Sequence, residues 1–208
     1  MQIGRSYPQR VRDNILPLSV AGTLPEAFKE WAFTENTEDH EDAIEVCQLC
    51  EHEDLRYHFE IKNEFTNKTL WVGSQCILKF NLSVFENTQR LTPQEAKKKL
   101  ERLTQQMRQE SCFNALRCLA QKEDNQILSN ALQFYEKNKY LTPKFAFVVL
   151  WRLDHLKIDH SASFFKVNLK KAKYKNDLQD MESSHLKMIW PALTFAQKQQ
   201  AMRLRTPA

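Results

Sequence analysis

Apolar residues after residue 73 recur mostly every three or four positions, which is the spacing of amphipathic helices. The clearest helix start is Thr92–Glu95, with an N-cap hydroxyl, Pro at the first helical position and Glu at the third. The stripe that follows consists of Ala96, Leu100, Leu103 and Met107, and it continues through Phe113, Leu116 and Leu119. We therefore expect a long helix from residue 93, with a change of phase near Ser111.

Further helices are expected downstream, among them a short one that ends at Trp190 and a final polar one that begins at Thr194; the first two matter most here. One begins at Asp124 or Asn125, and the next begins at Thr142. Phe145–Trp151 in the second is apolar on nearly all sides, so it is predicted to form the buried centre. The pattern of residues 164–175 fits a strand and a helix equally well, and both remain open.

The N-terminal part contains one further helix signal. Thr23–Glu26 has the form of a capping box, and Ala27, Phe28, Trp31 and Ala32 follow at helical spacing. This pattern predicts a short helix that ends near Phe33. An acidic loop is expected from Glu35 to about Glu45.

A β pattern occupies the stretch after this loop. Apolar and polar residues alternate over Leu55–Lys62, and Thr69–Val72 is rich in β-branched and aromatic residues. The polar connection 63–68, in which Asn67 suits a left-handed turn, predicts a β-hairpin. A short helix should follow over 74–80, with Ser74 as N-cap. The predicted fold class is mainly α (α+β), a helical body with one β-hairpin module.

Composition narrows the class of protein. The chain has 208 residues, of which 42% are hydrophobic and 27% charged, which is typical of a globular protein. Only 3 are glycines, which argues against Gly-rich phosphate loops and dinucleotide-binding fingerprints. The longest apolar run, Phe145–Trp151, is far shorter than the roughly 20 residues of a membrane span. We expect a soluble, cytoplasmic protein that does not bind membranes.

Charge is distributed unevenly along the chain. Residues 1–60 contain 5 Lys and Arg against 13 Asp and Glu, whereas residues 61–208 contain 25 against 13. Such polarity can steer partners of opposite charge. We predict an acidic N-terminal region, residues 1–90, that carries the hairpin module at 47–80, and a basic helical domain, residues 91–208.

The cysteines flank the hairpin. Cys47 and Cys50 form a CxxC knuckle before it, and Cys76 lies at the start of the helix after it. This order is that of a treble-clef zinc finger, in which the hairpin returns a distant thiolate to the metal. Lys79 stands where a second ligand from the helix is expected, so His52 is the preferred fourth ligand and His58 a weaker one. We predict a structural Zn²⁺, the alternative being three spare thiols, and we expect Cys112 and Cys118 to be small buried hydrophobes.

Three stretches of this module carry a resemblance: Cys47–Cys50, Leu55–Asn63 and Leu70–Phe80. They resemble a segment of poorly characterised bacterial, plasmid and phage proteins. The resemblance covers about 35 residues. It implies a zinc-stabilised hairpin module and a bacterial or mobile-element origin, and it implies no reaction.

Catalytic patterns are weak. Asp154-His155 and Asp159-His160 could in principle form an acid–base pair or a second metal site, but exposed polar pairs at a helix end are far commoner. No metalloprotease, nucleotide-binding P-loop, deaminase or nucleophile-elbow motif is present in the sequence. We therefore expect a non-enzymatic protein.

Basic residues form two clusters suited to phosphate contact. The first lies on the expected exposed side of the long helix and comprises Lys97, Lys98 and Arg102, with Lys99 beside them. The second comprises Lys166, Lys170, Lys171, Lys173 and Lys175. Tyr174 lies among the second group and is a candidate for stacking on bases.

These clusters predict a zinc-containing protein that binds DNA or RNA, although either cluster can also be an ordinary solvated face. The alternative is an interaction module, such as a phage or plasmid counter-defence inhibitor or adaptor. In that case the acidic stretch 35–54 imitates nucleic acid and docks on a basic groove of a bacterial protein.

Overall fold

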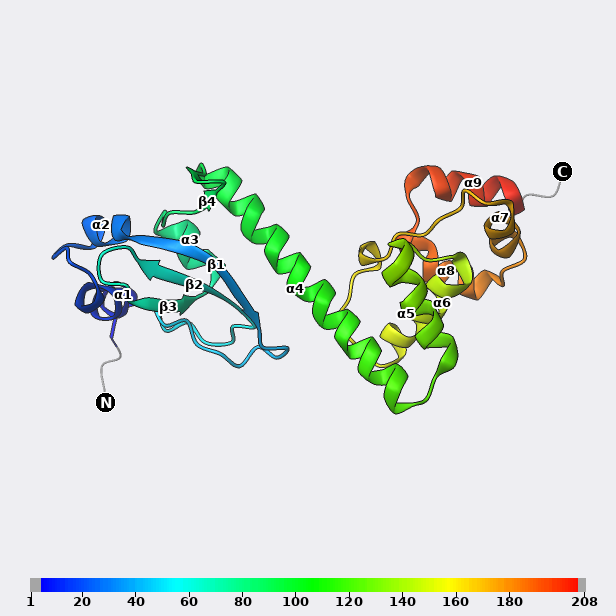
Figure 1. Cartoon of the computed structure of the whole chain (residues 1–208), viewed down its shortest axis with the longest axis horizontal. Helices are drawn as coiled ribbons and strands as arrows, with labels where there is room; N and C mark the ends of the chain where they lie inside the picture. The colour runs from blue at the N-terminus through cyan, green and yellow to red at the C-terminus, as the bar shows by residue number, and fades with distance from the viewer. Residues whose placement is uncertain (1–4, 206–208) are drawn as a thin grey trace. The chain divides into compact units, whose positions relative to one another are not determined.

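The computed structural model describes residues 5–205. These residues form nine α-helices, a three-stranded antiparallel sheet and a small two-stranded ribbon (Figure 1). With 56% helix and 14% strand, the mainly α (α+β) class is confirmed. Among the described helices, none combines the length and apolar character that a membrane span requires.

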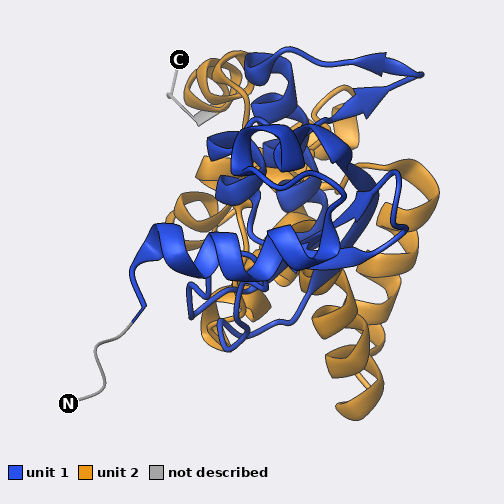
Figure 2. Ribbon diagram, turned by 90° about the vertical axis from the view of Figure 1, so that its left-hand side faces the viewer, with its two compact units in different colours: residues 1–107 blue, residues 108–208 orange. Residues whose placement is uncertain are grey.

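The chain divides into two compact units, residues 1–107 and residues 108–208 (Figure 2). The division lies inside helix α4 (Pro93–Lys122), whereas the sequence places a boundary at residue 90. The first half of α4 belongs to unit 1 because Ala96, Leu100 and Met107 are part of its core. The helix starts as predicted, with Thr92 and Glu95 exchanging the hydrogen bonds of a capping box.

Unit 1 is built on a sheet of strand order β1-β2-β3. Its helices are α1 (Tyr7–Ile15), α2 (Leu24–Ala27), α3 (Ser74–Lys79) and the start of α4. Its strands are β1 (Trp31–Asp39), β2 (Tyr57–Asn63), β3 (Thr69–Val72) and the ribbon pair β4 (Phe85–Glu86) and β5 (Gln89–Arg90). Single 3-10 turns cover Leu16–Leu18 and Phe28–Glu30.

The β2–β3 hairpin and the helix after it are confirmed. Phe59 and Ile61 of β2 and Val72 of β3 are fully buried, which explains the alternating pattern. Asn67 adopts the left-handed conformation, with a φ of 58°, in the connection. Helix α3 begins at Ser74, so its N-cap is Gly73 and not Ser74 as predicted.

The helix predicted after Thr23 begins at Leu24, but its predicted end near Phe33 is wrong. The helical segment ends at Glu30, and the chain continues as β1, so the hairpin becomes a three-stranded sheet. Trp31 and Phe33 are both buried on alternate positions of this strand, and the Trp31 indole N–H donates to the Ser19 hydroxyl at 2.9 Å. Pairing with β2 on one edge, and with Ser83 on the other, overrides the helical spacing.

The expected acidic loop is partly strand as well. β1 runs to Asp39 but its register shifts between Phe33 and Thr37, and Glu35 in this bulge has a φ of 75°. The Glu35 carboxylate pairs with the ammonium group of Lys99, which also donates to the Phe85 carbonyl at 2.6 Å. Lys99 is thereby buried, contrary to the prediction that it lies on the exposed side of the helix.

Unit 2 is a helical bundle. It contains the rest of α4, then α5 (Gln126–Asn138), α6 (Pro143–His155), α7 (Ala172–Gln179), α8 (Ser183–Ile189) and α9 (Phe195–Arg205). The predicted N-caps are confirmed, since the side chains of Asn125 and Thr142 accept hydrogen bonds from the first turns of α5 and α6. The buried centre predicted at 145–151 holds only in part, because Trp151 is 39% exposed.

Tertiary packing decides the ambiguous stretch 164–175. Residues 165–171 form an extended segment, in which Phe165, Val167 and Leu169 are buried, and α7 follows it. Phe165 packs against the rings of Phe113 and Tyr135, at centroid distances of 5.2 and 5.8 Å. A hydrogen-bonded bridge to Leu141 holds the segment in place.

We predict that Phe165→Ala lowers the free energy of unfolding of unit 2 by about 3–5 kcal/mol, since it removes a fully buried ring and leaves a cavity. Phe195→Ala is the matched control, because Phe195 is 76% exposed and its loss should change stability by less than about 0.5 kcal/mol. Denaturant unfolding of the two variants measures the difference. Equal effects would contradict the proposed packing.

A buried carboxylate in unit 1 generates a pH-dependent prediction. Burial of Glu30 opposes ionisation, but hydrogen bonds from the Asn63 amide and the Val20 and Ala21 N–H groups outweigh it, so the Glu30 pKa lies below its usual value of 4.5. A depressed folded-state pKa contributes stability that is present above the ordinary value and is lost as the pH falls through the folded-state value.

We expect Glu30→Gln to destabilise the protein by about 1–3 kcal/mol at neutral pH. Both carboxylate oxygens of Glu30 accept hydrogen bonds, whereas the NH₂ group of a glutamine would face N–H donors at one of these positions. The difference from the wild type should shrink as the pH falls below 4.5. Urea unfolding at several pH values measures it. The exposed Glu26→Gln is the control, and a pH-independent effect of Glu30→Gln would refute the assignment.

Candidate metal centre

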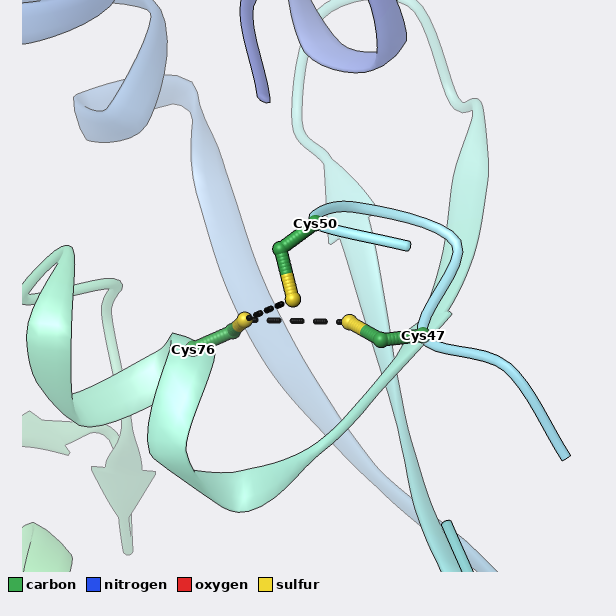
Figure 3. A group of neighbouring side chains, drawn as sticks. All are labelled: Cys47, Cys50 and Cys76. Carbon is green, nitrogen blue, oxygen red and sulfur yellow. Dashed lines mark hydrogen bonds between the residues drawn. The ribbon is translucent and has the colours of Figure 1, made fainter. Parts of the chain in front are cut away.

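Three cysteine side chains point toward one another at one edge of the hairpin (Figure 3). The Sγ atom of Cys76 lies 3.7 Å from that of Cys47 and 3.3 Å from that of Cys50, and all three sulfurs are within 4.8 Å of one another. A tetrahedral Zn²⁺ with Zn–S bonds of about 2.3 Å places its sulfurs about 3.8 Å apart, whereas a disulfide needs roughly 2 Å. The sulfurs are therefore spaced for a shared metal ion.

Backbone hydrogen bonds shape the knuckle that carries Cys47 and Cys50. The Cys47 N–H donates to the His52 carbonyl at 2.9 Å, and the Glu51 N–H donates to the Cys47 carbonyl at 2.8 Å. Glu51 adopts the left-handed conformation in this tight turn, with a φ of 58°. Leu49 between the two cysteines is fully buried and anchors the turn in the core of unit 1.

Two more hydrogen bonds attach the knuckle to the hairpin. The Gln48 N–H donates to the Trp71 carbonyl at 2.9 Å, and the Trp71 N–H donates to the Gln48 side chain at 2.8 Å. Strand β3 then leads through Gly73 into the first turn of α3, where Cys76 lies. The predicted knuckle, hairpin and helix thus bring the three thiols together.

The electrostatics of the cluster favour thiolate formation at one sulfur. A hydrogen bond with the Cys76 thiol lowers the pKa of Cys47 to about 5, against the opposing effect of burial, and the N–H groups of Leu49, Cys50 and Gly73 assist. The pKa of Cys76 is raised by the same bond with Cys47 and by burial, and burial raises the pKa of Cys50. Metal ions bind thiolates, so a cation at this point compensates several adjacent negative sulfurs.

The histidines lie outside this group of ligand atoms. The His52 side chain is exposed, and its backbone carbonyl is what contacts Cys47. His58 is buried on β2, where its Nδ1 atom lies 3.1 Å from Nε2 of His40. Among residues 5–204, Cys47, Cys50 and Cys76 form the one group of His, Cys, Asp or Glu side chains spaced to hold a metal.

The remaining candidates do not assemble into a second centre. His160 lies 3.4 Å from Asp154, while Asp159 forms an ion pair with Arg108. Cys112 is buried as predicted, and burial raises its pKa to about 12. Cys118 is exposed, contrary to the prediction, because it faces away from the apolar side of α4.

The two basic clusters differ in their partners. In the first, Lys97 is paired with Glu101 at 3.9 Å and Arg102 with Glu86 at 3.0 Å, which offsets much of its charge. Lys98 is exposed. The second cluster lies on the extended segment 165–171 and on α7, and its members Lys166, Lys170, Lys171 and Lys173 are exposed, with Lys175 half-buried.

Tyr174, predicted to stack on bases, is 6% exposed. It belongs to the packed face of α7, so its ring is covered by protein. The Lys171 ammonium group lies 5.5 Å from the centroid of this ring. Stacking on bases by Tyr174 is therefore excluded in this fold.

Sequence reasoning missed residues of α1 that lie beside the cysteines. Tyr7 and Arg10 line the same cleft as Cys50, Cys76 and Lys79. They lie 40 and 37 positions before Cys47 in the sequence, and no motif links them to the knuckle. Only the packing of α1 against the hairpin module brings them to this place.

We expect Cys76→Ser to reduce the bound metal to a small fraction of one equivalent per chain, since it removes one of three soft ligands. Elemental analysis of purified protein measures it. The thermal midpoint should fall as well, because metal binding to the folded state adds to its stability. Cys118→Ser is the control, and equal metal content in both variants would contradict the site.

Comparisons of the chain with protein-family models, with curated proteins and with solved structures find no match. The resemblance of residues 47–80 to segments of bacterial, plasmid and phage proteins therefore stays a prediction. The site itself supplies the argument: three buried cysteines that can bind a metal ion.

Proposed function

We propose that this chain is a non-enzymatic, zinc-containing nucleic-acid-binding protein of bacterial or mobile-element origin, in which unit 1 holds the metal and unit 2 contacts DNA or RNA. Unit 1 has 13 Lys and Arg against 17 Asp and Glu, and unit 2 has 17 against 9. Nucleic-acid affinity depends chiefly on cationic groups that neutralise phosphates. The net charge of +8 in residues 108–208 favours this unit as the contact surface.

The observation that carries the proposal is the extended segment 165–171. Its buried residues Phe165, Val167 and Leu169 hold the backbone in place. Lys166, between the first two, and Lys170, directly after Leu169, are exposed. Within residues 5–204, the ammonium groups of Lys166, Lys170, Lys171, Lys173 and Lys175 form no ion pair with a carboxylate. Cations on a fixed backbone that have no carboxylate partner are well suited to bind phosphate oxygens.

Zinc is the metal that suits unit 1 best. Thiolates select soft or borderline ions, and Zn²⁺ accepts the tetrahedral geometry that the sulfur spacing favours. An isolated two-stranded hairpin is marginal by itself, and here the ion would join the knuckle, the hairpin and α3. Its first role is therefore to stabilise the treble-clef-like module.

A second candidate is the interaction module that docks on a basic groove of a bacterial protein. The specific observation in its favour is the exposed loop after β1. Glu41 and Asp42 are exposed there, next to Ile44, which is 72% exposed. Parts of the stretch 35–54 are neutralised internally, since Asp39 pairs with Arg56 and Glu51 with Arg5.

We expect a triple charge reversal, Lys170→Glu, Lys171→Glu and Lys173→Glu, to weaken nucleic-acid binding at least tenfold. Each lost phosphate contact should also reduce, by about 1, the magnitude of the slope of the log binding constant against log salt concentration. Gel-shift or anisotropy titrations with duplex DNA, single-stranded DNA and RNA over a range of salt concentrations measure both effects.

The matched control changes the net charge equally in unit 1, by Lys97→Glu, Lys98→Glu and Arg102→Glu. It should retain most of the affinity, because Lys97 and Arg102 already have carboxylate partners. Equal loss in both triple variants would show a net-charge effect and overturn the assignment to 165–175. Capture of a bacterial protein that Glu41→Lys with Asp42→Lys abolishes, without any nucleic-acid binding, would favour the second candidate.

A further inference from the structure

A cleft of about 920 Å³ opens beside the three cysteines. Its walls are formed by Cys47, Cys50 and Cys76, by Tyr7 and Arg10 of α1, and by Lys79 of α3. An acidic rim, Glu51 and residues 53–54, completes it. This volume lies within the range of roughly 300–1,000 Å³ that small-molecule sites occupy in proteins.

The cysteines leave one coordination position without a protein ligand. A tetrahedral ion takes four donors, and in the part of the chain that the structure describes no fourth His, Cys, Asp or Glu atom joins the three sulfurs. Lys79, one helical turn after Cys76, lines the cleft where a treble-clef helix usually offers a ligand. Centres with three protein ligands keep the fourth position for water or an external ligand.

Cations line the cleft as well as its acidic rim. A divalent ion with three thiolates carries a net charge of −1, which the nearby cations Lys79 and Arg10 offset. The Lys79 Nζ atom lies 3.8 Å from the centroid of the Tyr7 ring, which places the ammonium group on the α1 side of the cleft.

Arg10 supplies an independent observation. Its Nε atom is buried and has no hydrogen-bond partner among the described residues. A buried donor without a partner is costly, and guanidinium groups prefer to donate to carboxylate or phosphate oxygens. The Nε atom itself is covered by protein, but Arg10 borders the cleft, and the remaining N–H groups of its guanidinium can donate to such an oxygen.

We propose that the fourth position of the metal is a binding site for an anionic oxygen ligand, a carboxylate or a phosphate group, held by Arg10 and Lys79. The inference rests on the metal centre of the proposed function and adds a ligand site to it. His52 also lines the cleft and is the side chain that competes with an external anion for the fourth position of the metal, so the experiment must distinguish the two ligands.

The test uses the full chain with Co²⁺ in place of the native ion. The thiolate-to-cobalt charge-transfer band reports that three sulfurs bind the metal, and the visible ligand-field band reports its fourth ligand. Sodium acetate and sodium phosphate are titrated separately at constant ionic strength. We expect a saturable change in the ligand-field band, and the anion that saturates at the lower concentration identifies a carboxylate or a phosphate ligand.

Arg10→Met and Lys79→Met should each raise the apparent dissociation constant about tenfold while leaving the charge-transfer band in place. Arg10→Lys keeps the charge but loses the guanidinium fork, so it should weaken binding as well, and it guards against misfolding of the Met variant. Lys62→Met is the control, since Lys62 is an exposed lysine of β2. His52→Ala should change nothing.

Two results would overturn the ligand site while the metal centre stands. One is a ligand-field band that neither anion alters. The other is a band that His52→Ala alters before any anion is added, which would make His52 the fourth ligand. Absence of the charge-transfer band would instead remove the metal centre, and with it this inference.

Discussion

The convergence of three sulfurs is the constraint on which unit 1 depends. Cys47 and Cys50 lie on a turn with little regular structure, and Cys76 lies on a helix of six residues. Neither element is stable by itself, because short helices and isolated hairpins are marginal in water. A metal bound by the three thiolates would join the turn, the hairpin and the helix, and it would offset the repulsion between charges that the buried sulfurs carry when ionised.

Unit 1 also contains buried charged side chains, whose positions are fixed by hydrogen bonds. Glu30 is buried and accepts three hydrogen bonds, and Lys99 is buried against Glu35 and the Phe85 carbonyl. Each buried charge thus has a partner, as burial requires. Two buried atoms of the described residues, Arg10 Nε and His58 Nε2, have no hydrogen-bond partner, and of these two residues Arg10 lines the cleft beside the cysteines.

Unit 2 follows a different principle, in which apolar packing fixes the backbone and leaves cations at the surface. The rings of Phe113, Tyr135 and Phe165 pack together beneath the extended segment. The lysines of this segment and of α7 therefore project from a rigid support. In the proposed binding to phosphates, such a surface would lose little backbone entropy, since the backbone is already ordered.

The sequence by itself determined the local elements and their order. Capping residues such as Thr92, Asn125 and Thr142 predicted helix starts, because these signals depend on neighbouring residues. The spacing of Cys47, Cys50 and Cys76 around a hairpin predicted that the three thiols lie together. Tertiary structure decided what depends on distant partners. Trp31–Asp39 became a strand because β2 offered an edge, and Lys99 became buried because the β1 bulge brought Glu35 to it. Arg10 reached the cysteines through the packing of α1, a contact that no local pattern encodes.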